Sequence, residues 1–226
     1  MKYPHIFLTA AMALAFGFTG CAATPTSRAL ETPQTQAAAR PYYGLRAPIV
    51  VANFDNRSNF MRGLFSDGTD RLGGQAKTIL MSHLTLTNRF YVLDRDNMEA
   101  ITREAEIRGD TQELMGASFV LTGDVSDFGR REVSTRAFFG ILGRGRQQVA
   151  YSRVNVNVVD IRTSAVVFSA QGAGEYALSD MEILGFGTVA GFDSTLNGRV
   201  LDLAIREAVD RLAEAIDSGR WNPAGL

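Results

Sequence analysis

Residues 153–170, RVNVNVVDIRTSAVVFSA, decide the fold class of this chain. The first half places three valines at alternate positions with polar or smaller residues between them, so one side of a strand would be apolar and the other exposed. Residues 162–164 then turn the chain into a second short strand at residues 165–170. The pattern predicts a β-hairpin with one face in a hydrophobic core.

The chain on either side of this hairpin alternates strands with helices. Runs of β-branched and aromatic residues predict strands at residues 47–54, 90–93 and 119–125. Apolar residues at helical spacing predict helices at residues 69–86, 94–107 and 196–217. We expect Asp67 or Thr69 to cap the first helix and Asp94 or Asp96 to cap the second, whose Met98, Ile101 and Ala105 lie along one face. The order of elements predicts a mixed α/β layer, a sheet with helices packed on it.

The N-terminus has the features of a processing signal. Lys2 precedes an apolar run at residues 6–18, which is too short to cross a bilayer as a permanent helix. The run leads into Phe18-Thr19-Gly20-Cys21, the pattern of a lipobox, in which the cysteine is acylated and the chain is cut just before it. We therefore expect a signal peptide at residues 1–20 and lipid on Cys21, the only cysteine. The alternative is an ordinary secretory signal with an incidental cysteine.

The residue after the cysteine, Ala22, is not the aspartate that usually retains such proteins at the inner membrane. We expect the outer membrane, on its periplasmic face. Residues 21–46 contain almost no large aliphatic side chains and are predicted to be a flexible tether, followed by one domain at residues 47–221. A formal net charge of −1 gives no basic stripe for nucleic acid.

Two segments, at about residues 127–150 and 171–192, do not fit the globular layer. Both are long and apolar for connections, and such connections are usually functional. One interpretation is a pair of β-hairpins that cover the sheet or mediate self-association; the other is a pair of strands in a transmembrane barrel, which need about 9 to 11 residues of alternating character. The second segment fits a barrel strand poorly. The residues of the first that would face the membrane are Val133, Thr135, Phe138, Phe139, Ile141 and Leu142.

No motif for catalysis, metal binding or a cofactor stands out. His83, the only histidine outside the signal peptide, lies in an apolar helical stripe and is interpreted as a packed or half-exposed residue. Residues 185–190 match a dinucleotide fingerprint, but no strand can return after the C-terminal helix. Asp94 with Asp96, and Asp124 with Asp127, are expected to cap helices and turns. We predict no catalytic residue, no metal, no cofactor and no enzymatic activity.

An ordered set of segments resembles the CsgG/HfaB family of curli secretion and holdfast-anchor lipoproteins, from Cys21 to about Trp221. The segments are IVVANFDNRSNF, ILMSHL, FYVLDRDN, GASFVLTGDV, VNVNVVDIRTSAVVFS and LGFGTVAGFDSTLNGRVLDLAIREAVDRL. The resemblance implies an α+β periplasmic domain that assembles into a ring, with two hairpins per subunit contributing to one shared transmembrane barrel. It also implies passage or anchoring of secreted fibre or adhesin subunits, with periplasmic accessory proteins as partners.

The resemblance places a constriction loop at about residues 63–69, where only Leu64, Phe65 and Asp67 could narrow a pore. The aromatic and asparagine residues of the family are replaced there, and the second hairpin is shorter than in the curli member. A second hypothesis is therefore a periplasmic scaffold lipoprotein that forms no pore, for example a regulator of a cell-wall synthase.

Overall fold

The computed structural model describes residues 33–60, 70–135, 145–177 and 194–223. The chain divides into two compact units, residues 1–33 and residues 34–226, and all of the described helices and strands belong to the second. The account below concerns that second unit.

Five strands form one mixed sheet in the order β2-β1-β3-β4-β5. Their bounds are β1 Ala47–Asn56, β2 Phe90–Val92, β3 Phe119–Thr135, β4 Gly145–Asp160 and β5 Val166–Ala177. The strand β1 pairs in parallel with β2 and β3, whereas β3, β4 and β5 pair antiparallel. The predicted α+β class and the predicted hairpin are confirmed, with β4 beginning well before the valine repeat that revealed it.

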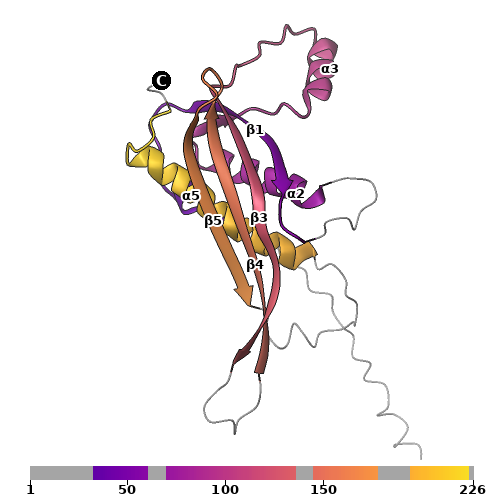
Figure 1. The fold of residues 1–226 in the computed structure, drawn as a ribbon. Helices are drawn as coiled ribbons and strands as arrows, with labels where there is room; N and C mark the ends of the chain where they lie inside the picture. Colours follow the sequence, from indigo (N-terminus) through magenta and orange to yellow (C-terminus); the bar gives the residue numbers. More distant parts are fainter. Residues whose placement is uncertain (1–32, 61–69, 136–144, 178–193, 224–226) are drawn as a thin grey trace, which may run out of the picture. The chain divides into compact units, whose positions relative to one another are not determined.

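Two helices cover one face of this sheet, α2 (Arg71–Leu86) and α5 (Ser194–Asp217), as Figure 1 shows. The alternate valines of β4 point toward them, and Val154, Val156 and Val158 are fully buried. The facing side chains are also fully buried, among them Leu80 of α2 and Leu201 of α5. The core is therefore a single layer between the sheet and the two helices.

Two glycines allow α5 to lie directly on β5. A Cβ atom added to Gly172 would stand 1.8 Å from the Ala204 carbonyl oxygen, and one on Gly174 would stand 2.7 Å from the Leu203 Cβ. Any larger residue would push the helix away, so the small residues of β5 set the separation between helix and strand.

The cap of α2 is Asp70 and not the predicted Asp67 or Thr69. One Asp70 carboxylate oxygen accepts from the Gly73 amide at 2.8 Å, and the other accepts from the Asn56 amide at 2.6 Å. The same side chain therefore starts the helix and fixes the end of β1.

The helix α3 (Met98–Arg108) departs from the prediction. Its N-cap residue is Asn97, which makes no side-chain cap hydrogen bond, and not the predicted Asp94 or Asp96, and no residue of α3 is buried. The helix stands out from the sheet on the connection between β2 and β3 (Figure 1), so its apolar stripe faces away from the core. Helical spacing alone does not distinguish an apolar stripe that faces the core from one that faces outward.

Asp94 and Asp160 each accept hydrogen bonds from backbone amides in a turn; the turn role of Asp94 was predicted. Asp94 accepts from the amides of Asp96 and Asn97 at 3.1 and 3.2 Å, and its hydrogen bond with the Asn97 side chain holds the pKa of Asp94 below its usual value. Asp160 accepts from the amides of Arg162 and Thr163, both at 2.8 Å, and these bonds, that from Thr163 first, lower the pKa of Asp160.

Candidate functional sites: a projecting hairpin and a clamped N-terminal segment

The strands β3 and β4 continue beyond the rest of the sheet. Their backbone pairing runs without a break from Asp127 to Thr135, which lies opposite Gly145. The neighbouring strand β5 ends at Ala177, opposite Val149. Within the described ranges, residues 132–135 and 145–148 therefore pair only with each other, and we call them the projecting hairpin.

Three adjacent strands hold the base of the projecting hairpin. Arg131 of β3 donates to a Glu175 carboxylate oxygen of β5 at 2.5 Å, across the intervening strand. The same guanidinium carbon lies 5.7 Å from the centre of the Tyr151 ring of β4. Because both partners are about half exposed, the ion pair fixes geometry more than it adds stability.

The structure places only part of the predicted membrane-facing set. Val133 and Thr135 lie in β3, opposite Gln147 and Gly145. Phe138, Phe139, Ile141 and Leu142 lie outside the described residues. So do Cys21, the proposed constriction residues Leu64, Phe65 and Asp67, and the fingerprint-like residues 185–190. In the second predicted segment, residues 171–177 form the end of β5, and residues 178–193 are not described.

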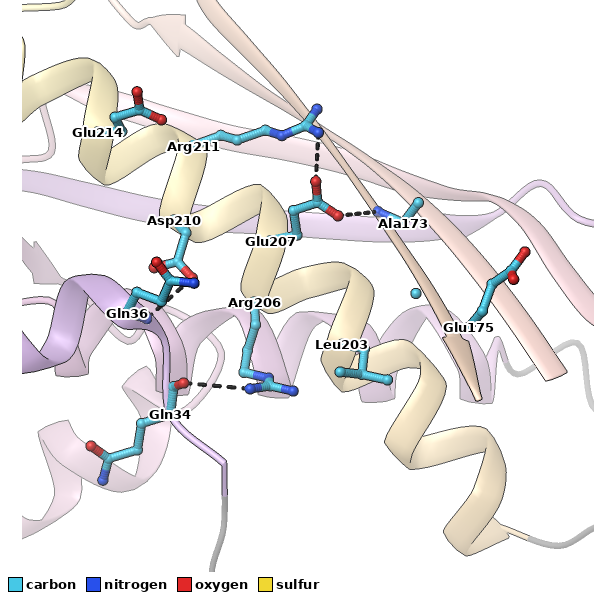
Figure 2. Close-up of a pocket in the computed structure, with 11 residues that line it drawn as sticks. Gln34, Gln36, Ala173, Glu175, Leu203, Arg206, Glu207, Asp210, Arg211 and Glu214 are labelled. Carbon is cyan, nitrogen blue, oxygen red and sulfur yellow. Dashed lines mark hydrogen bonds and ion pairs between the residues drawn. The ribbon is translucent and has the colours of Figure 1, made fainter. Parts of the chain in front are cut away.

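A groove of about 520 Å³ lies between α5, β5 and the residues that precede the first strand. Figure 2 shows charged side chains of α5 pointing into it. Glu207 accepts from the Ala173 amide at 3.2 Å and from Arg211 at 2.5 Å. Because β5 is the last strand of the sheet in the part of the chain that the structure describes, Glu207 satisfies a backbone group that no described strand pairs with.

The same helix binds residues 34–39 at the groove, as Figure 2 shows. Asp210 accepts from the backbone amides of Gln36 at 3.1 Å and of Ala37 at 2.8 Å, and Arg206 donates to the Gln34 carbonyl at 3.4 Å. These contacts begin a short 3-10 helix, η1 (Gln36–Ala39), in which Ala37 is fully buried.

Arg89 holds the other end of this segment. Its side chain is 1% exposed, and it donates to both carboxylate oxygens of Asp217 at 2.8 and 2.6 Å, to the Ala37 carbonyl at 3.2 Å and to the Thr87 carbonyl at 2.8 Å. Arg40 lies 3.7 Å from the same Asp217. We call residues 34–40 the clamped segment; the predicted tether of residues 21–46 therefore contains a docked part that its composition did not indicate.

The buried histidine links two helices through a hydrogen bond. His83 Nε2 of α2 lies 2.7 Å from an Asp202 oxygen of α5, and the other Asp202 oxygen lies 3.0 Å from Arg206. The histidine side chain is 4% exposed, so it is packed, as one of the two predicted interpretations had it. Within the described ranges, no three histidine, cysteine or acidic side chains lie close enough together to hold a metal ion. None of the helices described there has the length and hydropathy needed to cross a membrane.

The sequence is similar to one protein family and to a protein of Neisseria meningitidis. The family described as "Curli production assembly/transport component CsgG" matches residues 31–224. A protein of Neisseria meningitidis serogroup B, whose name describes it as a candidate lipoprotein, is 56% identical over 211 residues, which are 93% of this chain and 94% of that protein.

Three solved structures of low identity are also similar to this chain. The PelC dodecamer from Paraburkholderia phytofirmans is 15% identical, with a TM-score of 0.37 over 75% of this chain and 91% of that one. The protein CT253 from Chlamydia trachomatis is 14% identical, with a TM-score of 0.46 over 77% of this chain and 99% of that one. The lipoprotein GNA1162 from Neisseria meningitidis is 18% identical, with a TM-score of 0.34 over 62% and 90%.

Proposed function

Because the chain belongs to the CsgG family of curli production assembly and transport components, we propose that it is an outer-membrane lipoprotein that assembles into a ring for the export or anchoring of extracellular fibre or adhesin subunits. Lipid on Cys21 anchors it after removal of residues 1–20, and the domain faces the periplasm. The protein moves or holds its partners without catalysing a reaction.

The observation that carries this proposal is the projecting hairpin. Residues 132–135 and 145–148 have no further strand of the described chain beside them, so each leaves one edge of backbone groups without partners. An open edge in lipid would cost several kcal/mol for each unsatisfied group, so a membrane-inserted hairpin needs neighbouring copies on both sides. A ring of copies closes the sheet, which one copy cannot do.

The position of the clamped segment is compatible with this orientation. Thirteen residue steps separate Cys21 from Gln34, a chain that reaches at most about 45 Å when extended. The clamped segment and Ala173 line the same groove. Ala173 pairs with Arg153 of β4, which in turn pairs with Asp127 of β3. From there to Thr135, β3 rises by about 26 Å. The lipid can therefore reach a membrane entered by the tip of the projecting hairpin.

The first test concerns membrane insertion. We expect Phe139→Asp and Ile141→Asp to leave the lipid anchor in place but to abolish heat-modifiable, detergent-resistant oligomers, because a carboxylate on a lipid-facing strand is costly. Leu86→Asp, at a domain surface that is 43% exposed, serves as the matched control and should keep the oligomers. Electron microscopy of the purified unmodified protein should show rings. A uniformly monomeric protein after removal of lipid would rule out the channel.

The second candidate is a lipid-anchored periplasmic scaffold without a pore. It is favoured by the loop at residues 63–69, where the family's pore-narrowing aromatic and asparagine residues are replaced. In that case the Phe139→Asp and Ile141→Asp variants should behave in membrane extraction as the unmodified protein does. Cys21→Ala should release both a scaffold and a failed channel from the membrane.

A further inference from the structure

The face of the sheet opposite to the helices carries a row of valines. Val50 of β1 pairs with Val120 of β3, Val120 with Val159 of β4, and Val159 with Val166 of β5. Val166 is 59% exposed and the other three are partly exposed, although paired valines are favoured on a buried sheet surface. Residues 50, 120, 159 and 166 form a continuous apolar strip across four strands, which we call the valine row.

The connection between β2 and β3 carries a second apolar surface. We call residues 94–117, which include α3, the arm. Ile101, Leu114 and Met115 of the arm are 39%, 58% and 50% exposed. Arg95 ties this surface together, because it donates to the Met115 carbonyl at 2.5 Å and lies 3.9 Å from the Met98 sulfur. A hydrogen bond of 3.2 Å between the side chains of Thr102 and Gln112 holds the returning chain against α3. The arm is therefore an ordered surface.

The charges around the two surfaces are opposite. Glu104, Glu106 and Glu113 of the arm are exposed, and within the described ranges none of them has an ion-pair partner. Arg46 precedes β1, four residues before Val50, and Arg162 lies in the turn between β4 and β5, three residues after Val159. Both are exposed, and within the described ranges neither forms an ion pair; the Arg46 guanidinium carbon lies 5.5 Å from the centre of the Tyr91 ring, and the charge of Arg162 helps to lower the pKa of Asp160.

We propose that the arm of one copy docks on the valine row of the next copy. The two surfaces match in apolar character and in charge, yet neither is covered by the described residues of its own chain, so a second copy supplies what each one lacks. Such a head-to-tail contact uses two different surfaces of each copy, which generates a ring when the rotation closes. This inference rests on the oligomer of the proposed function and names the surfaces that would hold it together.

Cysteine cross-linking between two copies tests the contact directly. One full-length copy carries Leu114→Cys, a second copy with a different tag carries Val166→Cys, and Cys21 is unchanged in both. Under mild oxidation in membranes we expect a disulfide-linked pair that contains both tags. The control pair combines Leu114→Cys with Glu214→Cys, at an exposed site on α5, and should give none. Equal linkage in the control pair would overturn the proposal.

A charge exchange provides the second measurement. Arg162→Glu alone and Glu113→Arg alone should each weaken self-association in detergent roughly fivefold, because like charges then face each other across the contact. The protein with both substitutions should recover the association of the unmodified chain. Absence of this recovery would overturn the arm contact.

The outcomes separate this inference from the proposed function. Rings in electron microscopy together with no Leu114–Val166 linkage would overturn the arm contact and leave the ring in place. A uniformly monomeric protein would overturn both. Linkage of the two tags with recovery of association in the double charge exchange would support both.

Discussion

At the scale of single residues, Arg89 is a charged side chain buried in the described part of the chain. Its guanidinium is almost fully buried and donates four hydrogen bonds, two to Asp217, one to the Ala37 carbonyl and one to the Thr87 carbonyl. A buried charge is tolerated only when it is paired and hydrogen-bonded. Arg89 therefore stabilises the clamped segment by an arrangement that composition cannot reveal, since its partner Asp217 is 128 residues away in sequence.

The loss of that partner should be severe. In Asp217→Ala, a buried cation remains without its counter-ion, and we expect the free energy of unfolding to fall by roughly 3 kcal/mol or more. Urea denaturation at neutral pH measures the change. Glu214→Ala, one turn away on α5 and largely exposed, should change it by less than about 0.5 kcal/mol. Equal effects of the two substitutions would contradict the role assigned to Arg89.

Asp210 should control the order of the clamped segment. Asp210→Ala removes the acceptor of two backbone amides and should cost about 1 kcal/mol, as the loss of a helix cap does. Amide hydrogen exchange at Gln36 and Ala37 should accelerate, whereas exchange at Val154 in the centre of the sheet should stay slow. Unchanged protection at Ala37 would show that burial alone holds the segment.

Asp160 gives a pH dependence with a definite sign. Its pKa is lowered in the folded chain below the ordinary value of 3.8, so the folded state binds fewer protons than the unfolded state near that pH. Its contribution to stability is present above about pH 4 and is lost as the pH falls through the lower folded value. The difference in unfolding free energy between the unmodified chain and Asp160→Asn should therefore shrink below pH 3.8. A difference that stays constant from neutral to strongly acidic pH would contradict this.

At the scale of helices and strands, replacing glycine by alanine should have opposite effects on stability at two sites, one at the contact of α5 with β5 and one on α2. Gly172→Ala places a methyl group against the Ala204 backbone and should destabilise the fold by about 1 to 3 kcal/mol. Gly74→Ala, in α2 with nothing within 4 Å of the new atom, should stabilise it by up to about 1 kcal/mol. Thermal unfolding of the two variants should therefore move in opposite directions. A shared direction would mean that helix and strand can separate without cost.

Most of these elements could be predicted because they follow local periodicity. The valines at alternate positions gave the β4–β5 hairpin, and the apolar residues of α5 gave its bounds to within two residues. The side on which α3 is exposed could not be predicted, because an apolar stripe has the same spacing whether it meets its own core or another molecule. The full length of β3 also exceeds its apolar start, since its later residues are polar and charged.

At the scale of the whole molecule, the candidate sites depend on contacts between distant parts of the sequence. The order of elements indicated the mixed sheet, the length and apolar character of residues 127–150 indicated the first extended segment, and β3 and β4 remain paired there to Thr135 and Gly145. The groove could not be predicted, because Gln36 and Asp210 are separated by 174 residues and neither belongs to a recognisable motif. The alanine and glutamine residues of the clamped segment are typical of a flexible tether. The segment is docked because Asp210 of α5 accepts hydrogen bonds from its backbone amides.

The clamped segment also decides where mechanical tension would enter the domain. If the lipid is held in a bilayer while a partner is drawn away, the pull arrives at Gln34 and passes through Asp210 and Arg89 into α5. It does not reach β1 until those bonds are broken. The clamped segment would then detach first and lengthen the linker between the lipid and the domain, so that the sheet does not bear the initial load.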